Sequence, residues 1–396
     1  MRIHKRKFLL YIVLFLIVAI SVELLSYLFG QYGILKSRGS FLLADPRVSM
    51  TQSEIEKYFS SRDPILGWPS PDLLGTDDFD INGARHSPAY PQPGSAQVSL
   101  YGDSFTYGSD VDHEHAWGNV LSKLLGNRVA NYGVPGYGAD QAYLRFQTNI
   151  DDESKIVILG FIGDNITRII NQDRRLVWKP YGGLKLKPRF ILNERNQLAH
   201  IPIPPITQEL TPDYLAHPEK YLEHEWFLPG SGYGGVIFEF PFTISIAQAL
   251  IEKRAINFYL NRPYWFEYFN DTHESQALPL LVRIISSFDE LAAERDKRLL
   301  LVILPSARHL MYQKANRISP VKLLTERLND EDISYLDVTG HVLNELDGRK
   351  IDQIFTKQFI LNDRGGHYND IGNEIIAGII KRYLEQSYFF GEDRLP

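Results

Sequence analysis

The chain contains no cysteine among its 396 residues, which excludes disulfide bonds, iron–sulfur clusters, thiolate zinc sites and cysteine nucleophiles. It also has no excess of positive charge, because 42 Lys and Arg face 48 Asp and Glu. This balance argues against a general nucleic-acid-binding protein, whose affinity comes from neutralising phosphates. The mean hydropathy of −0.21 excludes a polytopic membrane protein. Any catalysis must therefore use oxygen or nitrogen nucleophiles or a metal held by hard ligands.

One long hydrophobic run stands at the N-terminus. Four basic residues and no acidic residue occupy positions 1–7, and the apolar run then extends from Phe8 to Phe29, interrupted only by Glu23. About 22 helical residues are long enough to cross a bilayer core. A basic flank favours a cytoplasmic N-terminus. No A-x-A-like cleavage site follows, so a retained signal anchor (8–29) is favoured over a cleaved signal peptide.

Short apolar runs alternate with helical patterns from residue 97 onward, and this alternation predicts a three-layer α/β fold around a parallel sheet. The predicted strands are Gln97–Ser104, Arg128–Gly133, Lys155–Ile162, Arg298–Leu304 and Ile333–Val338. Prolines break the segment 30–95, which we interpret as an extracytoplasmic linker or N-terminal extension. The predicted domain covers 96–390 and carries an insertion at about 171–276.

Polar residues and glycines follow several of these strands, at the edge where ligands gather in open parallel sheets. Ser104 ends the first strand, a glycine-rich turn containing Gly136 follows the second, and Asn165 follows the third. His367 lies late in the chain, after Asp363. A serine, a histidine, an acid and amide donors are what acyl transfer requires, because the hydroxyl needs a base and the oxyanion needs fixed donors.

These segments resemble the sequence blocks of the SGNH or GDSL hydrolases. The first block is GDSFTYG, the second lies at 131–136, the third is GDN at 163–165, and the last is HYNDIGNEIIA from His367. The resemblance implies a flavodoxin-like sheet, Ser104 as nucleophile and His367 as base. It also implies an oxyanion hole formed by the N–H groups of Ser104 and Gly136 and the side chain of Asn165.

Two positions depart from the family pattern. The family has its acid three residues before the histidine, where this chain has Arg364, so Asp363 is the expected orienting acid and a Ser–His dyad is the alternative. The third block reads GDN rather than GND. We assign Asn165 rather than Asp164 to the oxyanion hole, because a negative carboxylate would repel an oxyanion.

The beginning of the insertion is rich in basic residues, with aromatic residues further on. The basic residues are interpreted either as contacts for an anionic glycan or lipid headgroup or as a solvated face. The aromatic residues are interpreted either as a surface that stacks on sugars or forms an acyl pocket, or as a subsidiary core of the insertion. The candidate substrate-binding residues are Arg168, Arg174, Arg175 and Trp226.

The expected function is that of a serine esterase, held in the cytoplasmic membrane by one helix, with its catalytic domain in the periplasm or on the cell surface. Its expected substrates are acyl esters, with acetyl groups on an envelope polysaccharide favoured. One alternative is a polysaccharide O-acyltransferase using the same triad, and the other is a catalytically idle glycan-binding or assembly protein. No metal, cofactor or nucleic-acid partner is expected.

Overall fold

Five parallel strands form the central sheet of the protein, which we describe from a computed structural model covering residues 2–36, 42–45, 49–177, 183–260, 262–356 and 366–387. The strand order is β3-β2-β4-β8-β9. Numbered along the chain within this sheet, that order is the flavodoxin-like 2-1-3-4-5, which confirms the predicted fold class. The strands are β2 (Val98–Gly102), β3 (Val129–Asn131), β4 (Ile156–Phe161), β8 (Arg298–Ile303) and β9 (Tyr335–Asp337).

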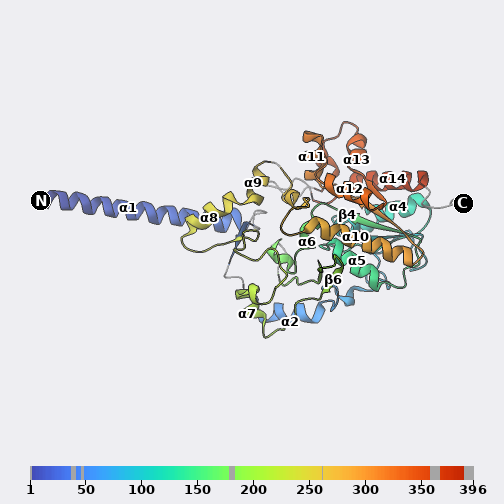
Figure 1. Cartoon of the computed structure of the whole chain (residues 1–396), viewed down its shortest axis with the longest axis horizontal. Coiled ribbons are helices and arrows are strands. Elements are labelled where there is room, and N and C mark those ends of the chain that lie inside the picture. Colours follow the sequence, from blue (N-terminus) through green and yellow to red (C-terminus); the bar gives the residue numbers. More distant parts are fainter. Residues whose placement is uncertain are drawn as a thin grey trace.

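Helices cover both faces of this sheet (Figure 1). One face carries α4 (Trp117–Leu125), α11 (Ala307–Asn316), α13 (Thr339–Glu345) and α14 (Asp370–Gln386). The other carries α5 (Ala139–Thr148), α10 (Ala277–Glu294) and α12 (Lys322–Asp330). Strand β4 contributes Ile158 to the first core and Leu159 to the second, because successive side chains point to opposite faces. Coverage on both sides explains why the strand sequence is apolar throughout.

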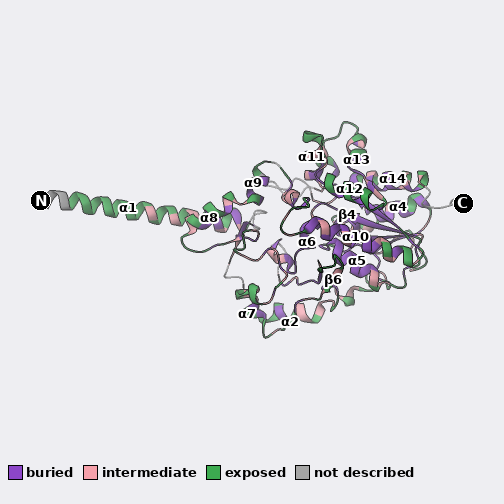
Figure 2. Cartoon of the chain, viewed as in Figure 1, coloured by how far each residue is buried: buried purple, intermediate pink, exposed green. Residues whose placement is uncertain are grey.

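The N-terminal helix α1 (Arg2–Leu28) projects away from the sheet domain and continues into a π-helical turn (Phe29–Ile34) (Figure 1). Its apolar side chains are exposed, in contrast to the buried interior around the sheet (Figure 2). Among the described residues, one helical span, Arg6–Ile34, is long and apolar enough to cross a bilayer. A signal anchor and a signal sequence both fit this description.

The part of the 30–95 segment that the structure describes packs against the sheet domain. It contains β1 (Leu43–Ala44) and α2 (Gln52–Ser61), which begins with a capping box at Thr51. Further along, Leu66, Trp68 and Ala84 are buried in the core formed with α5 and α10. The described part of the extension thus shares the core of the sheet domain.

The insertion is built from short elements rather than from a second large sheet. Its strands and helices are β5 (Arg189–Leu192), β6 (Leu198–Ile201), α7 (Thr211–Ala216), β7 (Val236–Ile237), α8 (Phe242–Ile251) and α9 (Lys253–Tyr259). Strands β5 and β6 form an antiparallel hairpin, and β7 pairs with β1 in parallel.

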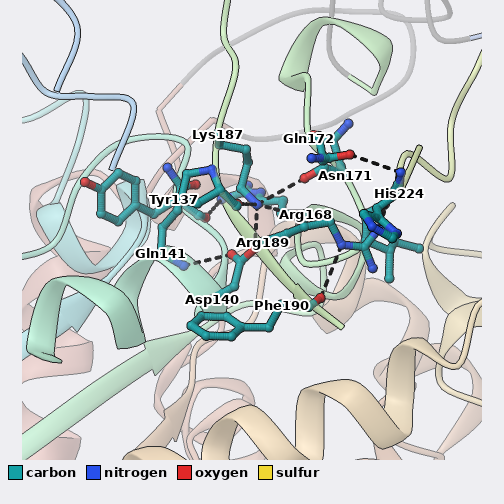
Figure 3. Close-up of polar contacts among 12 residues, drawn as sticks. Tyr137, Asp140, Gln141, Arg168, Asn171, Gln172, Lys187, Arg189, Phe190 and His224 are labelled. Atoms are coloured by element: carbon teal, nitrogen blue, oxygen red, sulfur yellow. Dashed lines mark hydrogen bonds and ion pairs between the residues drawn. The ribbon is translucent and has the colours of Figure 1, made fainter. Parts of the chain in front are cut away.

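A buried lysine fixes the start of the insertion to α5 (Figure 3). The Lys187 ammonium donates to Asp140 Oδ2 at 2.5 Å and to the backbone oxygens of Arg168, Asn171 and Pro188 at 2.8–3.1 Å. Both side chains of the ion pair are inaccessible to solvent. Burial lowers the pKa of the Lys187 ammonium, and the Asp140 carboxylate opposes this shift. The network therefore replaces almost the whole hydration shell of the ammonium.

We predict that Lys187→Met destabilises the full chain by about 3–5 kcal/mol, because it leaves the Asp140 carboxylate buried without a counter-charge. Thermal or urea denaturation in detergent, followed by circular dichroism, measures the change. Lys220→Met is the matched control, since Lys220 pairs with Asp213 at an exposed site and should contribute about 0–1 kcal/mol. Equal losses in the two variants would contradict a special role for the buried pair.

Candidate active site

Ser104 is the first residue of the short helix α3 (Ser104–Tyr107), which begins just after strand β2 ends at Gly102. The preceding residue, Asp103, caps this helix by accepting a hydrogen bond from the Phe105 N–H at 2.9 Å. Ser104 is 8% exposed, and among the described residues no group hydrogen-bonds to its hydroxyl. The hydroxyl therefore lies at the carboxyl edge of the sheet, and no described residue occupies it.

The loop after β3 lies directly against this helix. The Val134 N–H donates to the Gly102 oxygen at 3.0 Å. Gly133 allows the close approach, since a Cβ there would lie 2.6 Å from the Tyr107 backbone nitrogen. Gly136 follows with φ +87°, a left-handed conformation that glycine adopts without steric cost. Any larger residue would strain this turn.

The loop after β4 brings Asp164 and Asn165 to the same edge. Asn165 begins helix α6 (Asn165–Arg168), is 1% exposed, and has a buried side-chain oxygen without a hydrogen-bond partner among the described residues. Asp164 instead receives hydrogen bonds from Arg168 at 2.9 Å and from the Tyr264 hydroxyl. Of the two residues, Asn165 is thus the one whose side chain is left for a ligand.

Three hydrogen-bond donors at this edge share one property. The backbone N–H groups of Ser104 and Gly136 and the side-chain amide of Asn165 make no hydrogen bond to the described part of the chain. Buried polar groups are normally paired, so unpaired donors on three adjacent loops suit a site that binds an oxygen of a ligand. Such donors stabilise the oxyanion that forms when a nucleophile attacks an acyl carbonyl.

Arg168 holds the three loops together. Its guanidinium donates to Asp103 Oδ2 at 3.0 Å, to the Tyr137 backbone oxygen at 2.7 Å and to Asp164 Oδ2 at 2.9 Å. These three acceptors are immediate neighbours of Ser104, Gly136 and Asn165. Burial raises the pKa of the Asp103 carboxyl, and Arg168 opposes the shift by favouring the charged form. Arg168 therefore lies beneath the site as a buried structural cation.

His367 reaches the same edge from the segment before α14. Its ring lies 5.0 Å from that of Phe105, the residue after Ser104, measured between centroids. The Nδ1–H donates to Asp110 Oδ2 at 2.8 Å, and Thr356 Oγ1 donates to the same oxygen at 3.1 Å. This bond leaves the lone pair on Nε2 available to accept a proton.

Asp110 is the acid that the structure places against His367, and the sequence analysis did not identify it. The hydrogen bond from His367 lowers the pKa of the Asp110 carboxyl to about 2, against the opposing effect of partial burial. The carboxylate is therefore ionised at neutral pH and can stabilise an imidazolium. The expected acid, Asp363, lies in the segment 357–365, outside the described residues, so its role stays a prediction.

Arg85, from the N-terminal extension, holds the loop that carries Asp110. Its buried guanidinium donates to the backbone oxygens of Tyr107, Gly108 and Val111 at 2.5–2.9 Å. These bonds close the turn in which Asp110 adopts φ +69°. Asp and Asn tolerate this left-handed conformation better than most residues. The only sequence signal for Asp110 was thus an acid in the turn six positions after Ser104.

The same extension also supports the glycine-rich loop. Trp68 donates from Nε1 to the Pro135 oxygen at 2.9 Å, and the Tyr137 hydroxyl donates to the Trp68 oxygen at 2.5 Å. The two aromatic rings pack edge to face at 5.7 Å. Two residues of the extension therefore fix two of the loops at the site.

The residues predicted to contact substrate lie in more internal surroundings than expected. Arg168 is buried as described above, and Arg174 is 3% exposed. Arg175 forms an ion pair with Asp173, and Trp226 packs against Tyr233 with ring centroids 4.5 Å apart. A substrate contact for these four residues stays a prediction.

No protein-family model matches the chain. A curated relative, a long-chain-fatty-acid–AMP ligase (FadD26) of Mycobacterium marinum, is 34% identical over 109 residues, which are 24% of this chain. The chain spans only 18% of the length of that relative.

Several solved structures are similar to this chain. A lipolytic protein of the G-D-S-L family from Desulfitobacterium hafniense shares 14% identity with a TM-score of 0.36, covering 73% of this chain and 99% of that protein. TesA is 11% identical with a TM-score of 0.35, and the match covers 98% of TesA and 73% of this chain. The acetyl xylan esterase AlAXEase is 11% identical with a TM-score of 0.35, and the match covers 98% of that protein and 72% of this chain. Since these values are low, we infer function from the residues of the chain itself.

We predict that Asp110→Asn lowers kcat for an ester substrate by about 10²–10⁴ with little change in KM, because the imidazolium loses its counter-charge and His367 its fixed tautomer. Initial rates with p-nitrophenyl acetate measure the effect. Asp363→Asn is the matched variant and should retain most of the activity. A large loss in Asp363→Asn with none in Asp110→Asn would reverse the assignment.

We further predict that Asn165→Ala lowers kcat by about 10²–10³, since one oxyanion donor is removed. Asn171→Ala serves as a control for a buried amide beyond α6, because Asn171 bonds to Glu225 and the Asp173 oxygen. It should reduce stability rather than the turnover of the folded enzyme. Full activity in Asn165→Ala would remove Asn165 from the oxyanion hole.

Proposed function

We propose that the chain is a serine esterase whose nucleophile is Ser104. The observation that carries this proposal is the combination, at one sheet edge, of a His367–Asp110 pair with a serine hydroxyl and three donors that have no partner in the described part of the chain. Each group corresponds to one requirement of acyl transfer: nucleophile, base, orienting acid and oxyanion hole. The resemblance of the four sequence blocks to the SGNH hydrolases supports the same reading.

The reaction proceeds in two steps on these residues. His367 Nε2 takes the proton of Ser104 as Oγ attacks the acyl carbonyl, and the N–H groups of Ser104 and Gly136 with the Asn165 amide bind the oxyanion. His367 then returns the proton to the leaving alcohol, which yields an acyl-serine. In the second step His367 Nε2 takes a proton from water as the water attacks the acyl carbonyl. The bond to Ser104 Oγ then breaks, His367 returns the proton to Oγ, and the acid is released. Asp110 keeps the imidazole oriented throughout and remains ionised.

We also propose where the enzyme works and on what. The basic residues before Phe8 and the length of the apolar helical span Arg6–Ile34 support a single-pass signal anchor in the cytoplasmic membrane, with the N-terminus inside. The catalytic domain then faces the periplasm or the cell surface. Anchoring at that place favours esters of an envelope or exported polysaccharide, and acetyl groups are the favoured acyl groups.

A fluorophosphonate probe and p-nitrophenyl acetate test the proposed nucleophile in the full chain in detergent. We predict that Ser104→Ala abolishes labelling and lowers hydrolysis by at least about 10³. Ser109→Ala, a serine of the same loop, is the matched control and should keep both. A folded wild-type chain that neither labels nor hydrolyses would contradict the esterase proposal.

A further inference from the structure

Helix α8 of the insertion is attached to the apolar helix α1, on which it lies in Figure 1. The Glu23 carboxylate of α1 accepts hydrogen bonds from the backbone N–H groups of Phe242 at 2.7 Å and Thr243 at 3.4 Å. The Ser26 and Thr243 hydroxyls lie 3.0 Å apart, and the Tyr27 ring packs against that of Phe242 at 5.0 Å. The N-terminus of α8 is therefore fixed at the level of Glu23 to Tyr27.

The depth of this contact follows from helix geometry. Glu23 lies about 22 Å along the helix from Phe8, whereas the hydrocarbon core of a bilayer is about 30 Å thick. With Phe8 at the cytoplasmic edge of the core, Glu23 lies inside the outer half of the bilayer. A carboxylate is costly at that depth unless it is paired. The first N–H groups of α8, which have no partner within the helix, and the positive end of the helix dipole supply the required partners.

Helix α8 also has an apolar face that is exposed to solvent. The helix contains no charged residue in its sequence FTISIAQALI. Its inner face, including Ile246 and Ala249, packs in a small core with Ile34. Its outer face and the adjoining segment leave large apolar side chains in solvent: Phe240 (70%), Ile244 (54%), Ile251 (73%), Tyr259 (61%) and Leu260 (55%). Phe240, Ile244 and Ile251 also line one hollow, and an apolar patch of this kind marks an interaction site.

A hollow of about 800 Å³ lies beside this outer face. Its lining combines the apolar side chains of Ile237, Phe240, Ile244 and Ile251 with the polar groups of Glu239 and Lys253. Apolar side chains beside charged groups match the boundary between acyl chains and headgroups.

We propose that α8 and the beginning of α9 lie in the outer leaflet of the bilayer beside α1, with Phe240, Ile244 and Ile251 among the lipid acyl chains. The proposal rests on the membrane anchoring proposed above. The exposed face of α8 extends the exposed apolar surface of α1 at a level that the bilayer core reaches. The hydrolase domain is then held against the membrane surface by a second contact and does not swing freely on a tether.

The absence of native cysteine allows a direct test in the full chain. Single cysteines at Ile244, Ile251, Leu16 and Ile150 are labelled with an environment-sensitive nitrobenzoxadiazole dye, and the protein is reconstituted into phosphatidylcholine vesicles. Lipids carrying a doxyl quencher near the glycerol or near the chain centre report depth. Ile150→Cys is the control, because Ile150 is apolar, 79% exposed and follows α5 of the sheet domain.

We expect dyes at 244 and 251 to lose at least about half of their emission to the shallow quencher, as membrane-inserted labels do, and the dye at 150 to lose almost none. The dye at 16 should respond most to the deep quencher. Quenching at 16, with 244 and 251 behaving like 150, would overturn the α8 proposal and leave the anchor in place. No quenching at 16 would overturn the anchor and the α8 proposal together.

A second variant tests the contact that positions α8. Glu23→Leu removes the acceptor for the α8 N–H groups, so quenching at 244 should fall while quenching at 16 is unchanged. Glu23→Gln keeps an acceptor oxygen and should restore most of the quenching at 244. Equal quenching at 244 in the wild type and in Glu23→Leu would show that Glu23 does not hold α8 in the leaflet.

Discussion

The arrangement of the site depends on one buried cation. The Arg168 guanidinium lies out of water and is neutralised by Asp103 and Asp164. A buried charge with correct partners is costly to disturb, since removing one partner leaves the other unpaired. The residues that accept hydrogen bonds from Arg168 are Asp103, Tyr137 and Asp164. Each is a chain neighbour of one proposed oxyanion donor, so Arg168 fixes the positions of all three donors. An oxyanion hole requires such preorganisation, because donors that had to reorient would lose their advantage over water.

A second arginine does the same for the acid. Arg85 binds the backbone oxygen of Tyr107 at the end of α3 and those of Gly108 and Val111 in the following loop, which carries Asp110. The two cations hold different loops. One connects the loops that stabilise negative charge on the substrate, and the other positions the carboxylate that stabilises positive charge on His367. The proposed catalytic groups thus rest on ionic and backbone contacts rather than on packing alone.

The fold was predictable because parallel strands covered on both faces have a recognisable sequence. The apolar run of β4 and the helical patterns on either side of it were sufficient to predict a parallel sheet. The predicted topology then placed Ser104, Gly136 and Asn165 at one edge of that sheet. Asp110 was not predictable, because its contact with His367 depends on a turn closed by Arg85, which is distant in the chain. The burial of Arg168 was not predictable either, because a basic run in a sequence does not distinguish a buried cation from an exposed one. The prolines of the segment 30–95 were interpreted as a linker or an N-terminal extension, and such a pattern does not reveal that Leu66, Trp68 and Ala84 pack into the core.

In the sequence, the extension between residues 49 and 95 lies between the apolar helix α1 and the first strand of the central sheet, and it also braces two loops of the candidate site through Trp68 and Arg85. This connection bears on how such an enzyme could be shed from a membrane. Proteolysis on the membrane side of residue 49 would release a domain that keeps both supports. A cut at the boundary near residue 95 would break the covalent link between the supports and the loops that they hold. The position of the cut would therefore decide whether the shed enzyme keeps a stable site. The segment that tethers the enzyme and the segment that completes its catalytic unit overlap in the sequence.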